Sequence, residues 1–277
     1  MRIAATGVLE APPNTALIYR GPYEEIIPQM ARDGFEAAEL HILDSAQTDR
    51  KKLWDILHEH DMALSSIGTG SVYSARHYNL ADRDRSVREK TILHLREHMI
   101  TAQPDHAVVI LGVVAGRFID AGSPEAYREN LTESLYKLDE MAQELDVPLG
   151  LEIMGRHDSD WLNNMRIGAA FLRGNAFKKI LMHIDTFYMN IEEAEMGASI
   201  RAAGDLIGHV HIADNNRWYP GYGHIDFRNV LQALSDIGYD GTLALETYMY
   251  PDSSTSGKRG LAYLTFLMET IKESTWR

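Results

Sequence analysis

The sequence predicts a (β/α)8 TIM barrel that occupies residues 1–277 as a single domain. Short apolar runs alternate with longer amphipathic stretches eight times along the chain, which is the pattern of parallel β/α units. No linker or break in composition interrupts the series, and 277 residues suit one barrel of about 250 residues. No glycine-rich nucleotide-binding loop follows the first strand, which argues against an open dinucleotide-binding sheet.

The eight expected strands are short and mostly apolar, as buried parallel strands are. They cover residues 3–6, 37–41, 63–67, 107–111, 149–153, 180–185, 207–212 and 243–247. The helical patterns between them cover residues 23–32, 50–60, 84–102, 124–145, 165–173, 193–203, 227–237 and 257–272. Ser123 followed by Pro124 is typical of a helix start, and Gly34, Gly174 and Gly238 are expected just past helix ends.

Composition excludes several classes of function. A net charge of −13 argues against a nucleic-acid partner, because binding phosphates requires clustered Lys and Arg. The absence of cysteine excludes disulfides, thiolate metal sites and cysteine nucleophiles. No apolar stretch approaches the ~18 residues that a membrane span requires. We therefore expect a cytoplasmic protein that binds neither nucleic acid nor membranes.

Four ionisable residues stand at matching positions of the last four strands. In a β/α barrel the active site lies at the carboxyl ends of the strands, and side chains alternate between the helices and the barrel interior. The large apolar residues of each strand share one face, which leaves the other face to the barrel interior. The interior-facing positions end in Glu152, Asp185, His211 and Glu246.

These four residues predict a divalent metal site. Three carboxylates facing one point would repel each other unless a cation neutralised them. Each residue taken singly is more often a cap or a hydrogen-bonded core residue, but four at matching positions favour a metal. Three oxygen donors and one imidazole suit Mn²⁺, Mg²⁺ or Co²⁺ better than structural zinc, and Mn²⁺ is our first expectation.

Three longer motifs carry a resemblance to a known family. They are His183–Ile–Asp–Thr–Phe–Tyr–Met–Asn–Ile–Glu–Glu193, the run from His209 to Arg217, and the run from Pro220 to Phe227. The chain resembles the xylose-isomerase-like sugar phosphate isomerase/epimerase superfamily, and within it the ketose 3-epimerases of the tagatose/psicose type. The resemblance implies that the four residues bind the metal, that Glu152 and Glu246 also act as acid and base, and that the protein is a homodimer or homotetramer.

The substrate contacts follow partly from this resemblance. It implies that Arg217 contacts substrate oxygens and that Asp158 stands where relatives usually carry Glu. Tyr188 replaces a histidine that usually touches substrate in the family, so the resemblance does not identify the sugar that this chain binds. The residues themselves suggest Gly68 as part of a pocket loop and Trp218 as a pocket wall, although an ordinary turn and an oligomer contact explain them equally well.

The expected function is a metal-dependent 3-epimerase of a ketose or keto-sugar that works through a cis-enediolate. An aldose–ketose isomerase on the same metal site is the nearest alternative. An endonuclease acting at abasic sites is disfavoured, because it would need a histidine-rich trinuclear site and a basic surface. A non-catalytic sugar-binding barrel is a third alternative. No dedicated phosphate loop is visible, which slightly favours an unphosphorylated sugar.

Overall fold

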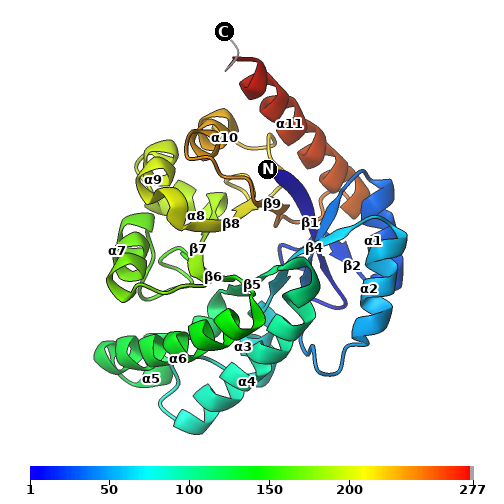
Figure 1. Cartoon of the computed structure of the whole chain (residues 1–277). Helices are drawn as coiled ribbons and strands as arrows, with labels where there is room; N and C mark the ends of the chain where they lie inside the picture. The colour runs from blue at the N-terminus through cyan, green and yellow to red at the C-terminus, as the bar shows by residue number, and fades with distance from the viewer. Residues whose placement is uncertain (275–277) are drawn as a thin grey trace.

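The computed structural model describes residues 1–274, which form a closed parallel barrel surrounded by helices (Figure 1). Each barrel strand pairs in parallel with the next one, and the last strand pairs back with the first. The eight barrel strands are β1 (Arg2–Val8), β3 (Ala37–His41), β4 (Ala63–Gly68), β5 (Val108–Leu111), β6 (Leu149–Glu152), β7 (Ile180–Asp185), β8 (Ile207–Ile212) and β9 (Thr242–Leu245). The predicted fold class is confirmed.

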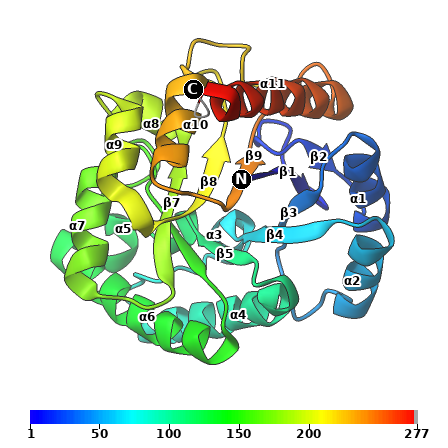
Figure 2. The ribbon, with the colours of Figure 1, turned by 45° about the horizontal axis from the view of Figure 1, so that its top comes forward.

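The helices lie outside the strands, as both views show (Figures 1 and 2). They are α1 (Tyr23–Arg32), α2 (Arg50–Glu59), α3 (Gly70–Arg76), α4 (Arg85–Ala102), α5 (Phe118–Ala121), α6 (Pro124–Leu145), α7 (Met165–Asn175), α8 (Thr186–Glu192), α9 (Met196–Ala203), α10 (Phe227–Asp236) and α11 (Ser253–Ser274). None of the helices within residues 1–274 combines the length and the apolar character that crossing a membrane requires.

Every predicted strand and helix is present with small shifts at its ends, and several short elements were not predicted. These are the two-residue strand β2 (Tyr19–Arg20), the helices α3, α5 and α8, and the single 3-10 turns η1 (Gln103–Asp105), η2 (Val113–Ala115) and η3 (Gly204–Leu206). The start of α6 is as expected, because the Ser123 side chain accepts a hydrogen bond from the amide of Ala126.

The prediction for Gly174 was wrong. Gly34 and Gly238 do follow their helices, with φ of 100° and 71°. Gly174 instead lies inside α7, which continues to Asn175 and ends at Ala176 in the left-handed conformation. A helix interior tolerates glycine at a cost of about 1 kcal/mol, so glycine alone does not fix where a helix ends.

The barrel interior carries small alanine side chains near the amino ends of the strands and polar side chains toward their carboxyl ends. Ala4, Ala37 and Ala244 form a small buried cluster in which neighbours pair directly across β1, β3 and β9. Two residues further along their strands the interior positions carry Thr6 and Glu39, both fully buried. The large apolar side chains point outward and form the main core with the helices. Alternation along each strand therefore directs polar side chains to the barrel interior near the carboxyl ends of the strands.

Candidate active site

A cavity of about 110 Å³ lies at the carboxyl ends of the barrel strands. Residues from β3, β4, β5, β6, β8 and the segments that follow the strands line it. The lining residues are His41, Gly68, Thr69, Gly70, Ile110, Gly112, Val113, Glu152, Met154, Tyr188, His211, Arg217 and Glu246. Six of the residues singled out from the sequence therefore share this cavity, namely Gly68, Glu152, Tyr188, His211, Arg217 and Glu246.

Glu152, Asp185 and His211 come together beside the cavity. Each offers one ligand atom, and the three atoms lie within 4.8 Å of one another. Asp185 ends β7 and also begins α8, because its Oδ1 accepts a hydrogen bond from the amide of Phe187 at 2.8 Å. This cap fixes the carboxylate at the strand–helix junction and leaves Oδ2 facing the cluster.

Glu246 lies next to this group but is not part of it. It follows β9, and its Oε2 is 3.4 Å from Nδ1 of His211. The same oxygen accepts a hydrogen bond from Nη2 of Arg217 at 2.5 Å. Glu246 also offers a ligand atom to a second group, which it forms with Glu39 and His41.

Arg217 joins two of the predicted metal ligands. Its Nη1 donates to Oδ2 of Asp185 and its Nη2 to Glu246. The backbone at Arg217 has a φ of 63°, and it lies in a loop that the buried Asp214 organises. The Asp214 carboxylate accepts hydrogen bonds from four backbone amides, those of Asn215, Gly221, Gly223 and Ile225.

The carboxylates perturb one another strongly. Burial first, and then the charges of Glu246 and Asp185, raise the pKa of Glu152 to about 8 against the opposing effect of His211. Burial also disfavours the charged form of Glu246, but the charges of His211 and Arg217 lower its pKa to about 2. The pKa of Asp185 is raised, mainly by burial. Buried carboxylates this close together repel one another when ionised, and a nearby positive charge would reduce that repulsion.

Glu39 is a central residue that the sequence analysis missed. It is fully buried on β3, and its carboxylate accepts hydrogen bonds from His41, His209, His211 and Ser66. Although burial opposes ionisation, the charge of His211 and the hydrogen bonds from the histidines hold the pKa of Glu39 well below its usual value. The alternation rule applied to β3 would have found it, since Ala37, Glu39 and His41 share the interior face.

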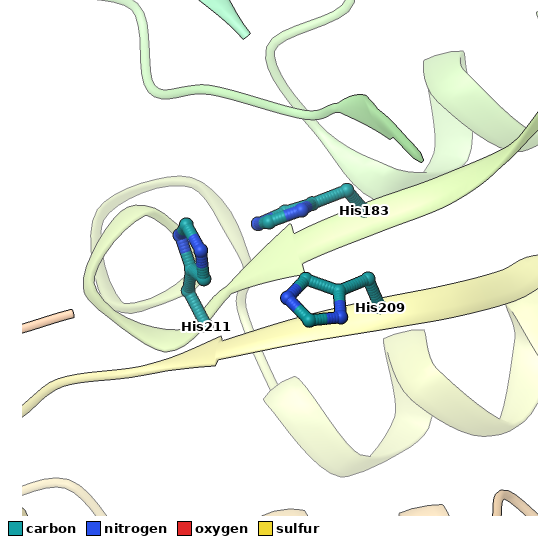
Figure 3. Close-up of side chains that lie close together, drawn as sticks. All are labelled: His183, His209 and His211. Carbon is teal, nitrogen blue, oxygen red and sulfur yellow. The ribbon is translucent and has the colours of Figure 1, made fainter. Parts of the chain in front are cut away.

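Three buried histidines lie close together on the adjacent strands β7 and β8 (Figure 3). His183 projects from β7, and His209 and His211 project from β8. The ring centroids of His183 and His211 are 4.1 Å apart. Neither ring nitrogen of His183 has a hydrogen-bond partner in the described part of the chain, and its Nε2 is 4.0 Å from Oε1 of Glu152. His183 and His209 therefore form the interior layer next to the predicted ligands.

Tyr188 and Asp158 form a pair at the rim of the cavity. The Tyr188 hydroxyl donates a hydrogen bond to Oδ2 of Asp158 at 2.8 Å, and the Arg217 guanidinium lies 5.3 Å from the centre of the Tyr188 ring. A Cβ atom on Gly155 would lie 2.9 Å from Cδ1 of Tyr188. The departures from the family noted at 158 and 188 are thus in contact, and the lack of a side chain on Gly155 makes room for the tyrosine ring.

The structure places two of the expected substrate contacts away from the cavity lining. Among the described residues, Asp158 and Trp218 do not line the cavity. The Trp218 ring instead stacks on Tyr222, with centroids 4.3 Å apart. Gly68 does line it, and a Cβ atom there would lie 2.4 Å from the His41 ring, so this glycine makes room for His41.

The donors at this site suit a divalent cation. The group of Glu152, Asp185 and His211 combines carboxylate oxygens with one imidazole, a set that suits Mn²⁺, Mg²⁺ or Co²⁺. Nδ1 of His211 is buried and has no hydrogen-bond partner among the described residues. An unpartnered imidazole nitrogen facing carboxylates is the arrangement that a bound metal would complete.

Several known proteins with similar sequences are named carbohydrate epimerases. The chain is 30% identical over 232 residues to an L-ribulose 3-epimerase of Mesorhizobium japonicum, covering 81% of this chain and 75% of that protein. It is 26% identical to a D-psicose 3-epimerase of Agrobacterium fabrum, covering 83% of this chain and 79% of that protein. A crystal structure of a D-allulose 3-epimerase from Methylomonas sp. in complex with D-allulose superposes with a TM-score of 0.80 at 25% identity, over 95% of this chain and 96% of that one.

The family model described as "Xylose isomerase-like TIM barrel" matches residues 27–266. This match includes seven of the eight barrel strands and every residue of the candidate site described above. The chain therefore belongs to the xylose isomerase-like TIM barrel family.

Proposed function

We propose that this protein is a metal-dependent epimerase that inverts C3 of an unphosphorylated ketose or keto-sugar. The observation that carries the proposal is the cluster of Glu152, Asp185 and His211 at the carboxyl end of the barrel, with Glu246 beside it. The relatives named L-ribulose 3-epimerase and D-psicose 3-epimerase match this chain over most of its length, which supports the same reaction class.

Glu152, Asp185, His211 and Glu246 would hold the metal, with Mn²⁺ as the first candidate. When bound, such an ion supplies a Lewis acid that polarises a substrate carbonyl and stabilises negative charge on the neighbouring oxygens. In the present arrangement Arg217 bonds to both Asp185 and Glu246. We infer that its guanidinium turns toward substrate oxygens when substrate and metal are present.

Glu152 and Glu246 are suited to move the proton at C3. The carbonyl of a 2-ketose acidifies the neighbouring C3–H bond, and loss of that proton gives a cis-enediolate. Inversion requires that a second group return a proton to the opposite face of the plane. Glu152 comes from β6 and Glu246 follows β9, so the two carboxylates enter the cavity from separate strands.

Tyr188, Arg217 and Gly68 form the part of the cavity available to the rest of the sugar. Arg217 offers guanidinium donors for substrate oxygens, and Tyr188 presents its ring to the cavity while its hydroxyl is engaged by Asp158. Asp158 would then act through Tyr188. Trp218 stacks on the exposed Tyr222, and neither residue lines the cavity. This aromatic pair would therefore meet a sugar only outside the cavity itself.

The proposal is tested by steady-state epimerisation with a panel of sugars. Purified protein loaded with Mn²⁺ is incubated with ketopentoses, ketohexoses and their phosphates, and the products are separated by chromatography. We expect an unphosphorylated ketose to be converted to its C3 epimer. Glu152→Gln and Glu246→Gln should each lower kcat by at least about 100-fold, the usual size of an acid or base contribution.

Glu140→Gln is the matched control, because Glu140 is an exposed residue of α6. It should keep the kcat of the parent protein. Near-parental turnover by metal-loaded Glu246→Gln would show that the acid/base assignment is wrong. An aldose as the product would favour the isomerase alternative.

A further inference from the structure

Glu39 reaches across the barrel interior to residues far away in sequence. It projects from β3, whereas His209 and His211 project from β8, which is not a neighbour of β3 in the barrel. The side chain of Glu39 is fully buried. Burying a carboxylate costs free energy unless hydrogen bonds compensate for the lost water. The hydrogen-bond partners of Glu39 therefore indicate its structural role.

Each carboxylate oxygen of Glu39 accepts two hydrogen bonds. Oε1 accepts from Nε2 of His211 at 2.8 Å and from Nε2 of His41 at 3.0 Å. Oε2 accepts from Nε2 of His209 at 2.8 Å and from Oγ of Ser66 at 2.6 Å. An ionised carboxylate can only accept, so each of these imidazole Nε2 atoms must carry its proton.

This arrangement determines which nitrogen of His211 remains available. With one proton held on Nε2, loss of the second ring proton to a bound metal would leave the lone pair of His211 on Nδ1. Nδ1 has no hydrogen-bond partner among the described residues and lies 3.4 Å from Oε2 of Glu246. The ring is also held at a fixed angle, because Nε2 is anchored and His183 packs edge-on against it at 4.1 Å.

We propose that Glu39 is the positioning residue that makes His211 a metal ligand through Nδ1, by holding the proton on Nε2 and fixing the orientation of the ring. Glu39 does not line the cavity, and the effect proposed here acts on the metal through His211. The inference rests on the metal site of the proposed function. It adds the prediction that the affinity of that site depends on a carboxylate from a non-adjacent strand, because a buried partner on the second ring nitrogen commonly orients a metal-bound histidine.

The first test uses the unmodified protein and a spectroscopic signature. Zn²⁺ is diamagnetic and permits long-range ¹H–¹⁵N spectra of ¹⁵N-labelled histidine in the metal-loaded protein. We expect His211 to show a protonated Nε2 and a metal-bound Nδ1. Coordination through Nε2 would overturn the inference, and no variant is needed to see it.

The second test compares Mn²⁺ binding by the parent protein and Glu39→Gln, measured by calorimetry and by the electron paramagnetic resonance of free Mn²⁺. Glutamine keeps the shape but offers one acceptor oxygen and an amide donor, so it cannot hold all four partners. We expect the dissociation constant to rise about 10- to 100-fold. The matched variant Ser66→Ala removes one neutral donor on the Oε2 side and should bind within about threefold of the parent.

Two negative outcomes remain distinct. If Glu39→Gln folds, as judged by circular dichroism, and binds Mn²⁺ as tightly as the parent, then Glu39 does not position the ligand and the metal site itself stands. If the parent protein binds neither Mn²⁺ nor Zn²⁺ at this site, then the metal site of the proposed function is wrong, and this inference is overturned with it.

Discussion

The space for the Glu152 carboxylate is created by the absence of a side chain on Gly112. A Cβ atom at Gly112 would lie 2.2 Å from Oε2 of Glu152. The carboxylate is the far end of a flexible side chain, so it can move away while the strand and its neighbours stay in place. Gly112→Ala should therefore act on the position of the carboxylate more than on the fold.

We expect Gly112→Ala to weaken Mn²⁺ binding by at least about tenfold, because the displaced carboxylate no longer faces Asp185 and His211. Calorimetric titration with Mn²⁺ measures this directly. Gly174→Ala is the control, since a Cβ atom at this position in α7 would meet no atom within 4 Å. It should bind Mn²⁺ like the parent and gain about 0.5–1 kcal/mol in stability. Unchanged binding by Gly112→Ala would contradict this account.

At the residue scale, strand alternation predicted the positions of Glu152, Asp185 and His211 but not the contacts that hold them. The rule considers one strand at a time, and it assigned the interior-facing positions wherever large apolar residues marked the helix-facing side. Alternation on β3 would have placed Glu39 in the barrel interior, but its contacts with β8, 170 residues away in sequence, cannot be predicted from one strand. The contact between Tyr188 and Asp158 likewise joins two separate loops, which no local pattern reveals.

At the scale of the element, long helices and strands follow from periodicity, whereas the short helices near the site do not. α8 has seven residues and begins directly where β7 ends. A segment of two turns is too short to show a helical period, and its stability comes from its cap and its packing. Here the cap is Asp185, so one residue both begins the helix and belongs to the proposed metal-binding group.

Helix α4 carries a buried histidine that makes stability depend on pH. His98 is fully buried, and its Nδ1 lies 2.7 Å from Oγ of Ser45. Burial first, and then the charges of His94 and Arg50, lower its pKa to about 3. Between about pH 6.5 and pH 3 the unfolded chain binds a proton here and the folded chain does not. Stability is therefore lost as the pH falls through this window, by about 1.4 kcal/mol per pH unit.

His98→Gln should remove this part of the pH dependence. We expect the difference in the free energy of unfolding between pH 7.0 and pH 4.5 to be smaller in the variant by about 2–3 kcal/mol, as measured by urea denaturation. The same substitution at His58, an exposed residue of α2, serves as the matched control. If His98→Gln loses as much stability on acidification as the parent protein, His98 does not cause this part of the pH dependence.

At the scale of the whole molecule, the eightfold alternation of strands and helices was sufficient to predict the closed barrel. Closure places the carboxyl ends of eight strands around one cavity, and this brings residues from His41 to Glu246 into one site. The chain has a net charge of −13, and several of its carboxylates are buried together at that cavity. A bound cation should therefore stabilise the entire fold.

We expect divalent metal to raise the Tm of the protein. A ligand that binds only the folded state stabilises it by about 2.7 kcal/mol at 100 times its Kd, which corresponds to a rise of several degrees for a chain of this size. Differential scanning calorimetry with and without Mn²⁺, after treatment with EDTA, measures the shift. Glu152→Gln should reduce it strongly. An equal shift in parent and variant would mean that the metal binds elsewhere.

The most direct test of the central claim is proton exchange at C3. The Mn²⁺-loaded protein is incubated in D₂O with unphosphorylated ketoses, and deuterium in the sugars is followed by NMR. The account predicts deuterium at C3 in the substrate and in its epimer, with exchange lost in Glu246→Gln. Exchange confined to C1, or no exchange with any ketose while Mn²⁺ is bound at the site, would contradict it.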